Sequence, residues 1–84
     1  MAATTLTYLT ISNVSEQLFK GEVASVSVPG IDGEMTLLAH HEPLVTLLMR
    51  GTVRVDTGTD EPKKEFLVDG GMVEVSRNTI TILV

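Results

Sequence analysis

The sequence predicts an all-β sandwich or barrel, and three observations support that prediction. Apolar and polar residues alternate with a period of two along most of the chain, which is typical of half-buried strands. Segments rich in Gly, Asp, Asn and Pro separate these stretches at intervals of roughly 8 to 12 residues. Hydrophobic residues make up 43% of the 84 residues. That content is enough for the packed core of a single small domain covering residues 1–84.

The first strands are expected near the N-terminus. "TLTYLTI" (5–11) mixes β-branched and aromatic residues, and "EVASVSV" (22–28) alternates strictly, so both stretches are expected to be strands. "FKG" (19–21), which lies between them, is expected to be a turn.

The next segment, "PGIDG" (29–33), is expected to reverse the chain. Pro29 ends strand pairing, and the two glycines allow backbone conformations that other residues avoid. Ile31 and Asp32 then occupy the tip of a tight, exposed loop. An isoleucine at such a tip either folds back onto the core or contacts a partner.

The second half of the chain contains four more alternating stretches. Turn signals at 56–62, 69–71 and 77–78 separate them. The expected strands are "TVRVDT" (52–57), "EFLVD" (65–69), "MVEVS" (72–76) and "TITILV" (79–84). The residues expected in the core are Val26, Val53, Val55, Phe66, Val73, Val75, Ile80 and Ile82. Several strands are partly apolar on both faces, which two facing sheets and a partner surface would together explain.

One segment is ambiguous from its pattern alone. "EPLVTLLMRG" (42–51) has Pro43 near a possible helix start and Gly51 as a possible C-cap. A short helix and a short strand are both compatible with this stretch.

Composition excludes several classes of function. The chain has no cysteine, which removes disulfides, thiolate metal sites and cysteine nucleophiles and favours an intracellular location. Its formal net charge is −5 and its six basic residues are scattered, so it is not expected to bind nucleic acid or an anionic membrane surface. The N-terminus lacks the features of a signal peptide, and no apolar run is long enough for a transmembrane helix.

Two features would suit a different kind of protein. His40 and His41 beside Glu42 could serve as metal ligands if they lie in a loop. Lys63 and Lys64 lie in a predicted loop, where carrier domains attach a prosthetic group to a lysine. A stand-alone β-domain that binds a metal or carries a prosthetic group is therefore the alternative function. The histidines lack fixed metal-ligand spacing, and "EPKKE" lacks the flanking residues of carrier domains.

The ordered set of short motifs resembles a known family. The stretch from "FKGEV" to "GTVRV", followed by "FLVDGGMVEV", is similar to the N-terminal β-sandwich of the epsilon subunit of rotary F-type ATP synthases. No single motif is specific, but their order is, and the match covers roughly residues 6 to 84. The matching positions are Phe19, Gly21, Val23, Val28, Gly33, Glu34, Leu38, His41, Pro43, Leu44, Gly51, Arg54, Val55, Gly70, Gly71, Glu74 and Val75.

The resemblance implies a fold and a role. The fold is a two-sheet β-sandwich of about ten short strands, with a strand over 44–50. The role is that of a non-catalytic rotor subunit of the central stalk, which couples ion translocation to ATP synthesis. The partners implied are the gamma subunit on one side and the polar loops of the c-ring on the other, with no cofactor and no metal. The location implied is the cytoplasmic face of a bacterial cell membrane, reached only through the complex.

The resemblance also assigns an interface. The c-ring-facing residues that it implies are Ile31, Asp32, Gly33, Glu34, His41, Glu42 and Pro43. Two departures from the family pattern stand out. Ala39 and His40 replace the Pro-Gly pair that usually precedes the histidine, so a bulky residue stands where a glycine would allow a tight turn. The 84 residues also contain no match to the family's C-terminal helical hairpin, so inhibitory and ATP-sensing roles are not assigned to them.

Overall fold

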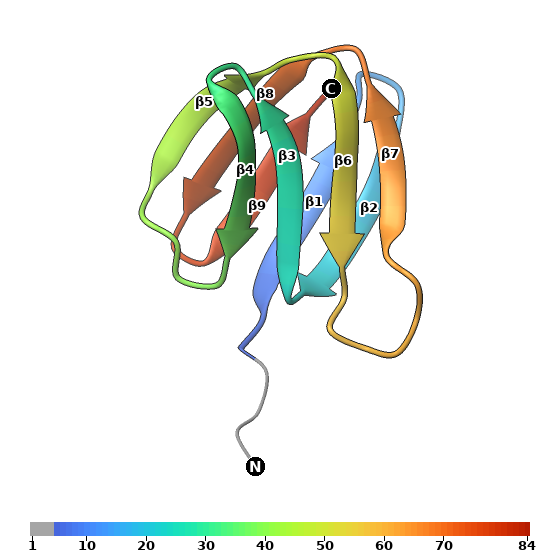
Figure 1. Cartoon of the computed structure of the whole chain (residues 1–84), viewed down its shortest axis with the longest axis vertical. Coiled ribbons are helices and arrows are strands. Elements are labelled where there is room, and N and C mark those ends of the chain that lie inside the picture. The colour runs from blue at the N-terminus through green and yellow to red at the C-terminus, as the bar shows by residue number, and fades with distance from the viewer. Residues whose placement is uncertain (1–4) are drawn as a thin grey trace.

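Every regular element in the described part of the chain is a β-strand (Figure 1). The structure is a computed structural model, and it describes residues 5–84. The all-β prediction is confirmed, with nine strands in place of about ten. The strands are β1 (Thr7–Ser12), β2 (Gln17–Val23), β3 (Ser25–Gly30), β4 (Gly33–Leu38), β5 (Leu44–Leu48), β6 (Gly51–Asp56), β7 (Lys64–Val68), β8 (Gly71–Ser76) and β9 (Thr79–Leu83).

The strands form one sheet that curls over on itself to make two facing layers. Its hydrogen-bonded order is β2-β1-β9-β8-β5-β3-β6-β7, with β4 paired to the free edge of β3. In Figure 1, β4, β3, β6 and β7 form the front layer, while β8, β9, β1 and β2 lie behind them. Only Met49 and Arg50 separate β5 from β6. At this corner the chain passes from one layer to the other.

The first and last strands are neighbours in the rear layer. β1 runs parallel to β9, with Leu9 opposite Ile80 and Ile11 opposite Ile82. The remaining strand pairs are antiparallel among the residues described. Two hydrogen bonds extend the junction beyond the strands, because Tyr8 N donates to the Asn78 carbonyl and Val84 N to the Ser12 carbonyl. The first and last strands therefore hold each other in place.

The core lies between the layers and is aliphatic. Alternate residues of β3, β6, β8 and β9 point inward, as the period of two predicts. Seven of the eight predicted core residues are confirmed as buried, and Phe66 is half-buried. The buried apolar residues are Leu9, Ile11, Val23, Val26, Val28, Leu37, Leu48, Val53, Val55, Val68, Val73, Val75, Ile80 and Ile82.

Phe66 is only half-buried because it sits at the open side of the sandwich. It lies on β7, and its ring meets that of Phe19 on β2 edge to face, with centroids 6.3 Å apart and planes inclined by 71°. β2 and β7 are the two terminal strands of the curled sheet. The aromatic pair therefore closes the gap that aliphatic residues leave between these edges.

The prediction of a turn over 19–21 is wrong. These residues lie inside β2, where Phe19 pairs with Ile11 and Gly21 with Leu9. Gly21 has no side chain to block its neighbour, and the Phe19 ring lies 3.8 Å from where a Cβ would be. The Phe19 ring thus lies over Gly21 on the same face of the strand, at ordinary van der Waals distance.

The predicted strand over 22–28 is interrupted at Ala24. β2 ends at Val23 and β3 begins at Ser25. Between them, Ala24 N donates to the Asp56 carbonyl at the end of β6, 2.7 Å away. β2 lies in the rear layer and β6 in the front layer, so this bond turns the chain sharply from one layer to the other within an alternating stretch. The ambiguous segment 42–51 contains the strand β5, as the resemblance implies.

We predict that Phe66→Ala lowers the free energy of unfolding by roughly 2 kcal/mol, less than the about 3–5 kcal/mol typical of a fully buried phenylalanine. The loss comes from the contact with Phe19 and the apolar area that it covers. Urea denaturation measures the change. The matched control is Leu67→Ala on the same strand, which should stay within about 0.5 kcal/mol because Leu67 is 89% exposed. Equal losses in both variants would contradict the closure of this edge by Phe66.

We also predict that two glycines with positive φ differ in their tolerance of alanine. Gly33 has φ +129° and open space around it, so Gly33→Ala should cost about 1–3 kcal/mol from backbone strain alone. Gly71 has φ +142°, and a Cβ there would overlap the Leu83 carbonyl oxygen. Gly71→Ala should therefore cost about 1–3 kcal/mol more. Thermal unfolding of the two variants gives the order, and a reversed order would refute the close approach of β8 to β9 at this point.

Candidate functional site

The β3–β4 turn presents the first group of predicted interface residues. Ile31 and Asp32 form its tip, and both are exposed. A backbone hydrogen bond ties the turn to β5, because Ile31 N donates to the Leu47 carbonyl at 3.0 Å. The Ile31 side chain is nevertheless 50% exposed. Gly33 and Glu34 follow at the start of β4 and are exposed as well.

The second group lies on the loop between β4 and β5. His41 is half-buried, while Glu42 and Pro43 are exposed. The His41 ring nitrogen Nδ1 lies 2.8 Å from the Glu42 carbonyl oxygen, and His41 N donates to the Leu38 carbonyl. His41, which the resemblance assigns to the c-ring-facing surface, is therefore only partly exposed. Its ring folds against its own loop.

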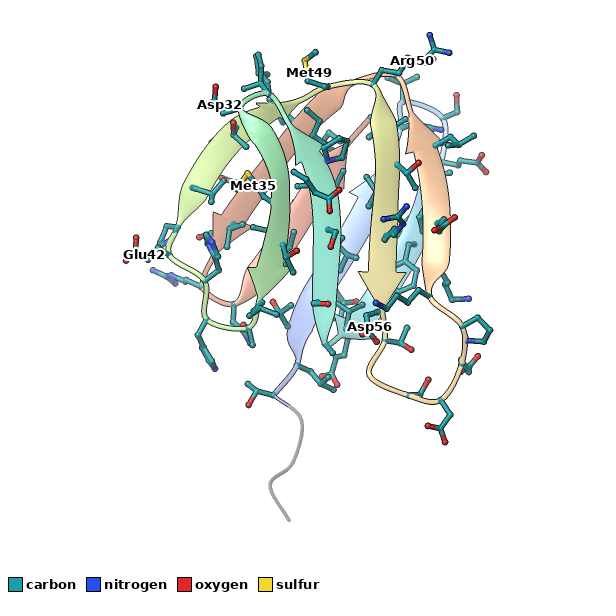
Figure 2. The ribbon with its side chains drawn as sticks, viewed as in Figure 1. Asp32, Met35, Glu42, Met49, Arg50 and Asp56 are labelled. Carbon is teal, nitrogen blue, oxygen red and sulfur yellow. The ribbon has the colours of Figure 1, made fainter. Side chains whose placement is uncertain are left out.

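The two groups lie at opposite ends of β4. In Figure 2, Asp32 lies at the top just before β4, and Glu42 lies lower, on the loop that leads from β4 to β5. The strand rises about 3.3 Å per residue, so Glu34 and Leu38 are already about 13 Å apart along it. Within residues 5–84 no ion pair joins Glu34 to His41. The sequence motif placed these residues close together in the chain, and the strand between them separates them in space.

The structure adds neighbours to the first group that sequence reasoning missed. Met49 lies beside the turn because its N donates to the Pro29 carbonyl at 2.7 Å. Figure 2 shows Asp32, Met49 and Arg50 at the same end of the molecule. The Arg50 guanidinium lies 3.5 Å from the Asp69 carboxylate, with both side chains almost fully exposed. Such a pair contributes little to stability. Because both side chains are almost fully exposed, their charges remain accessible to a partner.

A second surface lies on the outer side of β5, β8 and β9. Val45, Leu47, Met72 and Leu83 are exposed there by 61%, 56%, 37% and 49%. Leu47 is directly opposite Met72, and Met72 is directly opposite Leu83, so their side chains form a row across three strands. We call these four residues the apolar face. A contiguous apolar surface of this kind is typical of a contact with another protein.

The sequence carried a signal for the apolar face, although not its location. "LVTLL" in β5 is apolar on both sides, so one side had to face outward. Only the sheet order shows that the outward residues of β5, β8 and β9 come together.

The features that favoured the alternative function do not assemble a site. Among the residues that the structure describes, no three His, Asp or Glu side chains are placed to hold a metal ion. Lys63 lies in the loop before β7, while Lys64 is the first residue of β7 and pairs with Val55. Residues 5–84 contain no helix that could cross a membrane.

Comparison with protein families identifies the domain. Residues 6–84 match the family described as the ATP synthase delta/epsilon chain, β-sandwich domain. A curated relative, the ATP synthase epsilon chain of Dehalococcoides mccartyi, is 39% identical over 75 residues, covering 89% of this chain and 52% of its own length. The epsilon chain of Leptospira borgpetersenii is 42% identical over 77 residues, covering 89% and 59%. The chain thus spans about half the length of the curated relatives that it matches.

Experimental structures show the same fold. A chain of the mitochondrial ATP synthase of Euglena gracilis, from a structure of its F1 and c-ring assembly, superimposes with a TM-score of 0.86 at 26% identity, covering 94% of this chain and 50% of its own. A chain of the central stalk and c-ring structure of the Tetrahymena thermophila mitochondrial ATP synthase superimposes with a TM-score of 0.77 at 16% identity, covering 92% and 61%. The second likeness, at this low identity, concerns the fold alone.

We predict that Glu34→Ala and His41→Ala leave the fold intact. Glu34 is exposed, and the hydrogen bond of His41 stays within its own loop. Each substitution should change the free energy of unfolding by less than about 0.5–1 kcal/mol. Thermal unfolding monitored by circular dichroism measures both variants. A collapse of the cooperative transition in either one would show that these residues support the fold.

Proposed function

Because the chain belongs to the ATP synthase delta/epsilon family, we propose that it acts as a non-catalytic subunit of the central stalk of an F-type ATP synthase. The observation that carries this proposal is the match of the family's β-sandwich domain to residues 6–84, together with the same fold in ATP synthase structures. In this role the chain forms one domain over residues 1–84. It links the gamma subunit to the c-ring and couples ion translocation to ATP synthesis.

The c-ring contact is assigned to the side of the molecule that β4 borders. Ile31, Asp32, Gly33 and Glu34 lie at one end of this strand. The other end carries His41, Glu42 and Pro43. Thr36 and Leu38 face outward between them and join the two groups into one elongated surface. Exposed carboxylates and backbone groups at its ends suit hydrogen bonds to the polar loops of the c-ring.

The gamma contact is assigned to the apolar face. Val45, Leu47, Met72 and Leu83 offer the apolar centre that a stable protein contact requires. This face adjoins the β3–β4 turn, because Ile31 is bonded to Leu47 at the end of β5. The two assigned surfaces therefore meet at the β3–β4 turn.

The role proposed for these surfaces is mechanical. The domain holds its two partners in a fixed relation and passes rotation between them through shape and hydrogen bonds, with no metal, cofactor or nucleic acid. It reaches the membrane only through the complex. The proposed location is the cytoplasmic face of a bacterial cell membrane, which the bacterial epsilon chains among its relatives support.

A charged residue at the centre of the apolar face tests whether this face binds the gamma subunit. We predict that Leu47→Glu leaves the domain folded and weakens capture of the gamma subunit more than 30-fold, since a buried interface anchor contributes about 2 kcal/mol or more. Capture is measured by immobilising the tagged chain and adding the ATP synthase subunits of its own organism. The matched control is Leu67→Glu, because Leu67 is an exposed leucine on a different strand, β7. Equal capture by both variants would exclude the apolar face.

The c-ring surface is tested in the assembled enzyme. Glu34→Ala and Glu42→Ala should lower ion-driven ATP synthesis and leave ATP hydrolysis by the detached catalytic head unchanged. The two variants probe the two ends of β4 separately. Normal synthesis in both would refute the c-ring assignment, while a loss in one alone would restrict the contact to that end.

A further inference from the structure

The turn between β8 and β9 is the meeting point of three segments that are distant in sequence. Asn78 lies in this turn, and its side chain oxygen Oδ1 accepts a hydrogen bond from His40 N at 2.8 Å. Its side chain nitrogen Nδ2 donates to the Leu6 carbonyl at 2.9 Å. Its own carbonyl accepts from the Thr7 hydroxyl at 2.7 Å and from Tyr8 N at 3.2 Å. One residue thereby joins the start of β1, the β8–β9 turn and the β4–β5 loop.

The loop residue that Asn78 holds has an unusual backbone. His40 has φ +61°, in the left-handed region that residues with a Cβ generally avoid. The direct effect of this conformation is to set the direction in which the following residues leave the loop. Within this loop, His41 N donates to the Leu38 carbonyl, and His41 Nδ1 lies 2.8 Å from the Glu42 carbonyl oxygen.

Asn78 is itself well supported. Arg77 and Asn78 have φ +49° and +59°, which is the pattern of a two-residue hairpin turn of type I′. The bond from Thr7 adds support from a buried residue, because Thr7 is 1% exposed. The Asn78 amide therefore reaches from a turn with several hydrogen bonds to the β4–β5 loop.

We propose that Asn78 is a positioning residue, which fixes the conformation of the 39–43 loop by holding the His40 amide in its left-handed geometry. Its importance for partner binding rests on the proposed function, because this loop carries His41, Glu42 and Pro43. Among residues 5–84, no hydrogen bond joins Asn78 to these three residues, so it acts on them through the backbone of His40.

The first test is amide hydrogen exchange of the 84-residue chain, measured residue by residue by NMR. Asn78→Gly keeps the positive φ of the turn and removes both side-chain bonds. Exchange at the His40 amide should become about fivefold faster, the factor that corresponds to a hydrogen bond of about 1 kcal/mol. Core amides such as those of Val53 and Val73 should change much less. The control is Arg77→Gly in the same turn, which leaves the His40 exchange rate unchanged.

A second variant separates positioning from simple support of the fold. Asn78→Asp keeps an oxygen that can accept from His40 and loses the donor to Leu6. It should retain His40 protection while the start of β1 exchanges faster. Equal acceleration at His40, Leu6 and the core amides in both variants would overturn the proposal, as would fast His40 exchange in the parent chain.

The functional arm distinguishes this proposal from the one on which it rests. If Asn78→Gly frees the loop and also weakens coupled ATP synthesis in the assembled enzyme, both stand. If the loop is freed and synthesis is unchanged, Asn78 still positions the loop, and the assignment of 41–43 to the c-ring surface fails.

Discussion

The fold depends on the parallel pairing of its first and last strands. β1 and β9 supply the link between the β1–β2 hairpin and the rest of the rear layer. Parallel neighbours cannot be joined by a tight turn, so the chain between them must make a long excursion and return. That excursion includes the whole front layer, and its burial against the rear layer makes the closure favourable. The two surfaces considered for partners, and the turn that carries Asn78, are held in place by this closure.

The same closure explains why several strands are apolar on both sides. In the rear layer, inward residues such as Val73 and Ile82 build the core, while Met72 and Leu83 beside them remain exposed. A solvated sheet would carry polar residues at these outward positions. The inward residues build the core, and the outward apolar residues are those that the proposed partner contact would cover. Inward and outward apolar residues therefore occupy adjacent positions of the same strands.

Sequence patterns were sufficient for the fold class and most of the core, because alternation follows directly from the geometry of a strand. They failed where contacts between distant segments decide the local structure. Gly21 was predicted in a turn because glycine favours turns, yet pairing with β1 keeps it in a strand. The candidate site shows the same limit. Residues 31–34 and 41–43 are close in sequence, but β4 separates them in space. The hydrogen bond from His40 N to the Asn78 side chain, by contrast, joins two residues that no sequence pattern connects.

The composition of the core has a mechanical consequence. Of its fourteen apolar residues, eight are valine and three are isoleucine. Their branched side chains have few alternative rotamers, and a closely packed interior is hardly compressible. Under a sideways load, such a core offers almost no internal rearrangement that could absorb energy. In the proposed role, displacement at the 31–34 turn would pass to the apolar face with little loss inside the core, so elastic energy would accumulate in the attached partners. The domain would then serve as a rigid spacer and not as a spring.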